Sequence, residues 1–191
     1  MQKRLDQISN VIAGYSFREK MEPARNGNTA VVHIKDITDN LLINTANLSK
    51  TSNTKARDEQ YLQAGDIVLQ TTSSKYSAGI ISNMTIPTIA AAPCIIIRIV
   101  DTNVVSPLYI RWYLTNGLIQ NDILRLATGT YNKKLSKSEL SNIEVLVPSI
   151  EKQEKIIALA QLASEEQRLL DEIGELKKKY IGGALLKYAK S

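Results

Sequence analysis

The sequence predicts an α+β fold in which a mixed globular domain, residues 1–148, is followed by a long C-terminal helix within residues 149–191. Up to Pro148 the chain consists of short segments separated by turn residues, some rich in β-branched side chains and others with helical periodicity. From Ser149 onward there is no proline, and one helical pattern continues almost to the C-terminus. The length of 191 residues is consistent with one or two domains.

Five segments of the first region are predicted to be strands, because each is about four to eight residues long and rich in β-branched side chains. They cover residues 30–37, 66–72, 78–82, 94–100 and 143–147. Residues 106–129 have apolar side chains at helical spacing, which predicts two helices divided near Gly117. Ser106 before Pro107 is a favourable helix start, since proline suits the first turn, and Gly129 is a suitable end.

The C-terminal region is predicted to form one helix from Ile150 to Ile181, about 48 Å long at roughly 1.5 Å per residue. Ser149 can cap its first turn, and the acidic residues near the start and the lysines near the end suit the helix dipole. The expected helix stops before the pair Gly182–Gly183.

A seam of apolar side chains at intervals of seven residues runs along this helix, which indicates a coiled coil. Glu166 interrupts the seam at one position. The alternative is a surface helix packed against its own domain. Apolar residues outside the seam, Ile156, Ile157, Leu170 and Leu185, favour a further protein contact. The residues expected to mediate dimerisation are Leu162, Leu169, Ile173, Leu176 and Tyr180.

The net charge of +5 is concentrated in the first region, which contains 16 Lys and Arg and 12 Asp and Glu. This mild basicity is compatible with binding to nucleic-acid phosphates, although many proteins that never bind DNA are equally basic. No apolar run reaches the roughly 18 residues of a membrane span, and the N-terminal charges are not those of a secretory signal. Cys94 is the only cysteine, so we expect a cytoplasmic protein of a reducing compartment.

Residues suited to catalysis are scarce. His33 is the only histidine, so neither a zinc site nor a Ser–His or Cys–His pair has its usual residues. The absence of any Gly-x-Gly pair excludes the glycine-rich nucleotide loops. Glu175 and Lys177 have the acid-x-lysine spacing of some nucleases, but a solvated helix face explains them better. The chain is therefore expected to be neither an enzyme nor a metal-binding protein.

Three polar loops are suited to recognition rather than to catalysis, because they are rich in amide, hydroxyl and ammonium groups. Asn and Gln can pair with adenine, Lys and Arg with guanine or phosphate, and Ser and Thr with bases or phosphates. Ordinary solvent-exposed loops are the simpler alternative for any one of them. The candidate contacts are Lys50, Asn53, Lys55 and Arg57 in the first loop, Thr71, Thr72, Ser73, Ser74, Lys75 and Tyr76 in the second, and Thr130, Tyr131, Asn132, Lys133, Lys134 and Lys137 in the third.

Several stretches resemble the specificity (S) subunit of type I restriction-modification systems, in a half-length form with one target recognition domain. "LDQISNVIAGYSFREK" from Leu5 is similar to the opening of such a domain, and "VVHIKDITD" from Val31 to its following strand. "LQAGDIVLQTTSS" from Leu62 resembles the family's Gly-Asp-Ile turn into a strand. Residues 106–157 resemble the family's helices, last strand and spacer-helix start, where "PSIEKQEKI" carries Lys152 inside the usual Glu-Gln pair.

The resemblance implies a non-catalytic subunit that recognises double-stranded DNA and binds no cofactor itself. Modification (methyltransferase) subunits using S-adenosylmethionine would methylate adenine, and a restriction (motor-nuclease) subunit using ATP and magnesium would cleave unmodified DNA. Full-length members carry two recognition domains and two helical spacers, so the chain is expected to pair with a second copy through an antiparallel coiled coil. Such a homodimer would read a symmetric bipartite site. A non-catalytic dimeric protein–protein interaction module is the alternative function.

Overall fold

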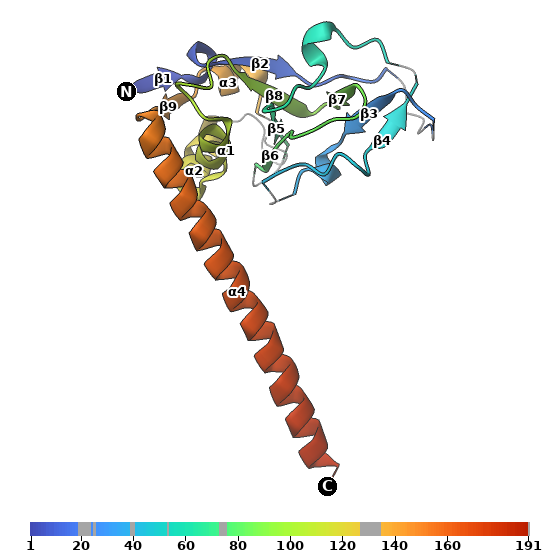
Figure 1. Cartoon of the computed structure of the whole chain (residues 1–191), viewed down its shortest axis with the longest axis vertical. Helices are drawn as coiled ribbons and strands as arrows, with labels where there is room; N and C mark the ends of the chain where they lie inside the picture. The colour runs from blue at the N-terminus through green and yellow to red at the C-terminus, as the bar shows by residue number, and fades with distance from the viewer. Residues whose placement is uncertain are drawn as a thin grey trace. The chain divides into compact units, whose positions relative to one another are not determined.

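The computed structural model describes residues 1–18, 24, 26–38, 41–52, 54–72, 76–126 and 135–190. The chain divides into two compact units, Met1–Gln153 and Glu154–Ser191. The described strands and short helices lie in the first, which we call the globular unit, whereas helix α4 (Ile150–Ala189) starts there and makes up the second. The predicted α+β class with a long C-terminal helix is confirmed (Figure 1).

The central sheet is antiparallel and has the strand order β2-β8-β5-β6. Its strands are β2 (Ser9–Ala13), β8 (Cys94–Ile99), β5 (Ile67–Gln70) and β6 (Ala78–Ile80). Val68 lies opposite Ile96, which in turn lies opposite Ile12 on the next strand. All three side chains are buried, so they form an apolar row across the sheet. The strands β5, β6 and β8 confirm three of the sequence-based predictions.

Two smaller sheets complete the globular unit. One joins β4 (Ser49–Thr51), β3 (Thr29–Val32) and β7 (Thr88–Ala90), with β3 antiparallel to β4 and parallel to β7. The other pairs β1 (Gln2–Arg4) with β9 (Glu144–Leu146). The strands β3 and β9 were predicted, whereas β1 and β4 were not, because each is a three-residue polar segment that only pairing with a distant strand makes extended.

The two predicted helices are α1 (Pro107–Thr115) and α2 (Gly117–Leu126), separated at Asn116, whose backbone is extended. A further helix, α3 (Lys137–Ser141), was not predicted although its signal is present in the sequence. The backbone N–H of Glu139 donates to Oγ of Ser136 (3.2 Å), and the Ser136 N–H donates to Oε2 of Glu139 (2.6 Å). This reciprocal capping box starts the helix.

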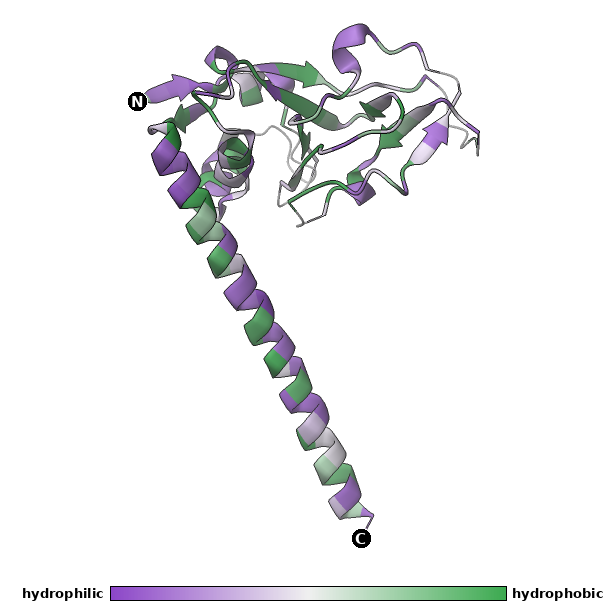
Figure 2. Cartoon of the chain, viewed as in Figure 1, coloured by the Kyte–Doolittle hydropathy of each residue, from purple (hydrophilic) through white to green (hydrophobic). Residues whose placement is uncertain are grey.

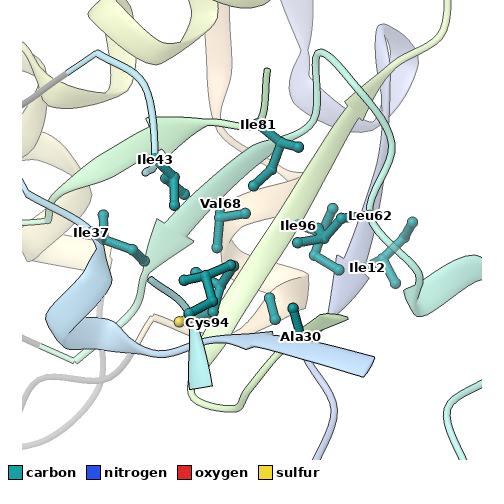
Figure 3. Close-up of a cluster of buried hydrophobic side chains, with 12 residues drawn as sticks. Ile12, Ala30, Ile37, Ile43, Leu62, Val68, Ile81, Cys94 and Ile96 are labelled. Atoms are coloured by element: carbon teal, nitrogen blue, oxygen red, sulfur yellow. The ribbon is translucent and has the colours of Figure 1, made fainter. Parts of the chain in front are cut away.

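The main core cluster lies between the central sheet and the β4-β3-β7 sheet (Figure 3). Ile12 and Ile96 enter it from the first sheet and Val32 from the second. Burial of one such side chain contributes about 1.5–3 kcal/mol to folding. Cys94 belongs to the same cluster, and burial, with a smaller effect of Asp36, raises the pKa of its thiol to about 12. The thiol is therefore protonated and unreactive at neutral pH.

The Gly-Asp-Ile turn before β5 has a clear structural cause. Gly65 has a backbone φ of 89°, which favours glycine over residues with a side chain. Asp66 is only 1% exposed and forms two hydrogen bonds with the guanidinium of Arg98 on β8, at 2.9 and 2.7 Å. The hydrogen bond with Asp66 raises the pKa of Arg98. Arg98 also donates to the Tyr61 carbonyl (2.8 Å), so the turn is tied to the middle of the central sheet.

The first turn of α4 is fastened to the globular unit by the amide of Gln153, which has no exposed surface. The Ser106 N–H donates to Oε1 of Gln153 (2.9 Å), and Nε2 donates to the carbonyls of Val104 and Pro148, both at 2.9 Å. The side chain thereby joins the loop before α1, the proline after β9 and the start of α4. In the sequence this glutamine belongs to the "PSIEKQEKI" stretch, and the structure gives the reason for its position.

Helix α4 is longer than predicted. It continues through Gly182–Gly183 to Ala189 and has 40 residues, which corresponds to about 60 Å instead of the expected 48 Å. Each glycine costs roughly 1 kcal/mol in a helix, but the following Ala-Leu-Leu segment consists of good helix formers. Figure 2 shows hydrophobic residues recurring along the helix between hydrophilic ones. Among the described residues, no helix is long and apolar enough to cross a membrane.

The seam predicted from the sequence is exposed along α4 in the single chain. The exposed fractions are 68% for Leu162, 45% for Leu169, 48% for Ile173, 59% for Leu176 and 79% for Tyr180. Outside the seam, Leu170 and Leu185 are also exposed, whereas Ile157 is buried. Glu175 forms an ion pair with Lys178 at 2.8 Å on the helix surface, as expected for a solvated helix face.

Substitution of Gln153 by leucine is expected to destabilise the globular unit. It leaves two carbonyls and one N–H of partly buried backbone without their partner, and such unsatisfied groups cost about 1–3 kcal/mol each when water cannot replace the partner. We expect the free energy of unfolding to fall by about 2–5 kcal/mol, measured by denaturant titration of Trp112 fluorescence. The exposed Gln161→Leu is the matched control, and an equal loss in both variants would contradict the role given to the Gln153 amide.

Candidate nucleic-acid interface

The second polar loop is the turn between β5 and β6. Leu69 pairs with Ala78 across the hairpin, and the Gln70 N–H donates to the Ser77 carbonyl (2.9 Å). Nε2 of Gln70 donates to the Thr72 carbonyl (2.9 Å). Both ends of the turn are therefore fixed by hydrogen bonds. The tip, residues 73–75, lies outside the described residues.

Side chains from both adjoining helices hold the far end of this turn. Nε of Arg111 on α1 donates to the Ala78 carbonyl (3.0 Å). Nε2 of Gln120 on α2 donates to the Tyr76 carbonyl, and Gln120 is only 5% exposed. Because both acceptors are main-chain carbonyls, these contacts hold the backbone whatever side chains the turn carries. The hairpin is thus supported on one side by α1 and α2.

The third polar loop ends against the same hairpin. The N–H of Leu135, which follows the undescribed residues 127–134, donates to the Thr71 carbonyl (3.0 Å). Leu135 is itself buried, and Oγ1 of Thr71 donates to the Pro93 carbonyl. The second and third loops, about 60 residues apart in sequence, are therefore brought together where β5 ends and α3 begins. We call this region the loop junction.

Two of the predicted contact residues at the loop junction are structural instead. Thr71 is 1% exposed and Tyr76 has no exposed surface, so neither offers a side chain to DNA in this structure. The flat aromatic surface expected of Tyr76 is packed inside the fold because the residue lies at the covered start of β6. Burial, with a smaller effect of Glu139, raises the pKa of the Tyr76 hydroxyl. That hydroxyl has no hydrogen-bond partner in the described part of the chain.

Thr72 and Lys137 remain accessible at the loop junction. Thr72 is half-buried, and Lys137 is exposed at the first position of α3. The remaining candidates of these two loops, and one from the first, lie outside the described residues and stay predictions: Asn53, Ser73, Ser74, Lys75, Thr130, Tyr131, Asn132, Lys133 and Lys134.

The first polar loop is not brought to the loop junction. Lys50 lies on β4, which is at the end of the globular unit opposite α1 and α2 (Figure 1). Lys55 is exposed, and its backbone N–H donates to the Tyr15 hydroxyl (3.2 Å). Arg57 is exposed and paired with Glu59 at 2.9 Å. The described cations of the first loop therefore lie apart from the loop junction.

The described residues offer little for metal or acid–base chemistry. Among them, no three His, Cys, Asp and Glu side chains lie close enough to hold a metal ion. Burial lowers the pKa of His33, against the opposing effect of Asp36, so its imidazole is neutral at neutral pH. His33 lies at a shallow, open pocket with Ile34, Lys35 and Ala92. The arrangement at the loop junction is suited to binding through backbone, hydroxyl and ammonium groups.

Sequence reasoning missed Arg111 and Gln120, which position the second loop, and Gln153, which holds the start of α4. A signal existed for Gln120, because it lies three residues before the buried Ile123 on the apolar face of a helix. A polar side chain on such a face usually has a buried partner. The Ala78 carbonyl bound by Arg111, and the Ser106 N–H and Val104 carbonyl bound by Gln153, are distant in sequence, so no local pattern identifies these partners.

A family model described as the type I restriction modification DNA specificity domain matches residues 1–178 of the chain. No curated protein matches the sequence at a significant level. Among solved structures, the HsdS subunit from Thermoanaerobacter tengcongensis is similar, with a TM-score of 0.65 and 16% sequence identity. The match covers 90% of this chain and 39% of that subunit.

Two further structures show the same likeness. A chain from a study of complex assembly and conformational transition of the type I R-M system matches with a TM-score of 0.65 and 15% identity, covering 89% of this chain and 39% of the other. The type I restriction-modification S subunit from M. genitalium matches with a TM-score of 0.55 and 13% identity, covering 94% and 42%. At these identities the likeness concerns the fold. The chain spans about two fifths of the length of the structures it matches.

The burial of the Tyr76 hydroxyl can be tested by comparing the stability of two Tyr→Phe variants. Tyr76→Phe removes a buried hydroxyl without a described partner, so the free energy of unfolding should stay within about 1 kcal/mol of the original or rise. The matched control is Tyr109→Phe, which removes the hydrogen bond from its hydroxyl to the Leu146 carbonyl (2.6 Å) and should cost about 1 kcal/mol. Denaturant unfolding checks both, and a larger loss for Tyr76→Phe would contradict this placement.

Proposed function

The chain belongs to the type I restriction-modification DNA specificity family, and we propose that it acts as a DNA-recognition subunit without a catalytic step of its own. The single observation that carries the proposal is the family match over residues 1–178. The loop junction supports it, since two polar loops meet on a backbone that α1, α2 and the carbonyl of Pro93 hold in place. Their side chains would contact base edges and phosphates of double-stranded DNA.

Phosphate binding would fall mainly to the third loop. Lys137 is exposed at the loop junction, and Lys133 and Lys134 precede it by a few residues. Ammonium groups neutralise phosphates without reading the sequence, so these three lysines would set affinity and orientation. Specificity would come from amide and hydroxyl groups of both loops, with Thr72 the accessible described candidate.

Two copies of the chain are proposed to act together. The seam on α4 is exposed over several turns, and an apolar seam of this length is stabilised by a second helix. Antiparallel pairing of two α4 helices would place one globular unit at each end. Because such a homodimer has two-fold symmetry, the DNA site would be an inverted repeat of two half-sites with an unread segment between them.

The remaining subunits of the system would supply the chemistry. We propose that the homodimer positions modification (methyltransferase) and restriction (motor-nuclease) subunits on the bound site. S-adenosylmethionine, ATP and magnesium would be bound by those subunits and not by this chain. Exposed apolar residues of α4 outside the seam, including Leu170 and Leu185, are candidate contacts for the modification subunit.

The symmetry of the DNA site tests the proposal directly. Selection of duplexes from a random pool by the purified chain should enrich an inverted bipartite repeat, because both half-sites are read by identical surfaces. A duplex with one half-site scrambled is the matched control and should bind much more weakly. Enrichment of an asymmetric bipartite sequence would rule out the homodimer, and the absence of any DNA affinity in a dimeric protein would favour the interaction-module alternative.

Removal of the lysines of the third loop should reduce the salt dependence of DNA binding. The triple variant Lys133→Ala, Lys134→Ala, Lys137→Ala is expected to bind more weakly and to lower the slope of log affinity against log salt by about 2–3 per half-site. Fluorescence anisotropy over a salt series measures this. The triple variant Lys152→Ala, Lys155→Ala, Lys190→Ala removes the same charge from exposed positions outside the three polar loops and is the control for a general loss of charge. An unchanged slope in the third-loop variant would exclude the loop junction as a phosphate contact.

A further inference from the structure

Charge is unevenly distributed along α4. From Ile150 to Glu175 the helix carries 7 Asp and Glu against 3 Lys and Arg, whereas residues 176–190 carry 5 Lys and no acidic side chain. The helix is therefore acidic over its first part and basic over its last part. The two ends of α4 are therefore complementary in charge. Within one helix these ends cannot meet, so only a second copy can bring the opposite charges together.

The charges closest to the seam follow the same division. Glu165, Glu172 and Lys179 recur every seven residues along one flank, each directly before a seam position. Arg168 pairs with Glu165 (2.7 Å) and Glu172 (3.2 Å) within the helix. For Lys179, the structure gives no ion pair within the described part of the chain. A carboxylate from another helix would complete this flank.

We propose that two copies pair through α4 in an antiparallel direction and in one defined register, centred between Gly174 and Glu175. This inference rests on the homodimer proposed above and adds the register to it. In this register Ile173 packs against Leu176 of the second copy, and Leu169 packs against Tyr180 of the second copy. With their symmetry mates these layers form a continuous apolar centre from residues that are all exposed in the single chain.

The charges of α4 favour this arrangement over a parallel one. Glu172 lies beside Lys179 of the second copy, and the two-fold axis repeats the pair on the other side. A parallel, in-register pair would also join opposite charges at its flanks, Glu172 with Lys177 of the second copy, but its seam would place Glu166 against Glu166 and Lys187 against Lys187 of the second copy. Like charges at such positions are destabilising.

The same charges disfavour the neighbouring antiparallel registers, although the register shifted toward the N-terminus would also form a Glu165–Lys179 pair. A shift by one heptad toward the N-terminus places Glu172 beside Glu172 of the second copy. The opposite shift places Lys179 beside Lys179 and Lys177 beside Lys177 of the second copy. Only the register centred between Gly174 and Glu175 avoids a like-charge pair on the two-fold axis and forms opposite-charge pairs instead.

Two of the departures from an apolar seam, Glu166 and Gly183, also fit this register, and at a third Lys187 lies opposite Leu162 of the second copy, where a long side chain can extend its ammonium group to solvent. Glu166 lies opposite Gly183 of the second copy, and because glycine has no side chain the carboxylate has space and can stay hydrated. In the register shifted toward the N-terminus, Glu166 would lie opposite Leu176 and its charge would be buried at a cost. The extension of α4 through Gly182–Gly183 is required here, because a helix that ended at Ile181 would lack this layer.

Disulfide cross-linking of single-cysteine variants tests the register. Leu169→Cys and Tyr180→Cys are prepared separately and mixed before mild oxidation, and dimers are measured by non-reducing electrophoresis. The native Cys94 does not interfere, because it is 2% exposed and the pKa of its thiol is about 12. In the mixture the two cysteines face each other, while the other symmetry-related Leu169–Tyr180 layer stays intact.

The expected result is a cross-linked dimer in the mixture and none with either variant alone. In this register two copies of residue 169, or two of residue 180, are about 16 Å apart along the axis, too far for a disulfide. Cross-linking of either variant by itself would show a parallel pair and overturn the register. Cross-linking of Leu169→Cys with Ile173→Cys instead would show the register shifted by one heptad and would also overturn it.

Sedimentation of the unmodified protein separates this inference from the proposed function. A monomer would remove the homodimer and the register together, without bearing on DNA recognition by a single globular unit. A dimer with the wrong cross-link would remove the register alone. Charge exchange gives a second readout: Glu172→Lys and Lys179→Glu should each weaken the dimer severalfold, and the double variant should restore its affinity. No restoration in the double variant would exclude the Glu172–Lys179 pairing.

Discussion

The hydrogen bonds of the Gln153 amide are the interaction on which the organisation of this protein depends. One oxygen and one nitrogen satisfy a backbone N–H at Ser106 and the carbonyls of Val104 and Pro148, and the amide is completely buried. A primary amide is the side chain that can accept and donate in this way within a small volume. The contact joins the first turn of α4 to the same loop that starts α1.

Hydrogen bonds to main-chain atoms also hold the loop junction. Arg111, Gln120 and the N–H of Leu135 all hold main-chain carbonyls of the β5–β6 hairpin. A framework that binds backbone atoms does not depend on the side chains at the tips of the loops. Those side chains are therefore free to differ in chemistry while the loops stay in place, which is the physical requirement for a protein that reads one particular sequence on a common fold.

Helix α4 shows a different balance of forces. Its apolar seam is exposed, contains a glutamate and a glycine, and is flanked by charges that change sign along the helix. Apolar burial alone would allow several alignments of two such helices, since it is not directional. The charges and the two irregular seam positions distinguish among these alignments. In the proposed homodimer, stability and specificity of pairing would thus come from different residues of the same helix.

The sequence by itself determined the α+β class, the strands β3, β5, β6, β8 and β9, the division of α1 from α2 and the seam of α4. These features follow from local periodicity and from residues such as Pro107 and Asn116, whose conformational preferences act within a few positions. Only the tertiary structure decided that the polar strands β1 and β4 form, that α4 passes Gly182–Gly183, and that Tyr76 and Thr71 are buried. It also decided that the second and third loops meet while the first lies apart. The reason is that burial and long-range hydrogen bonding depend on which distant segments pack together, and that information is not contained in any short stretch of the chain.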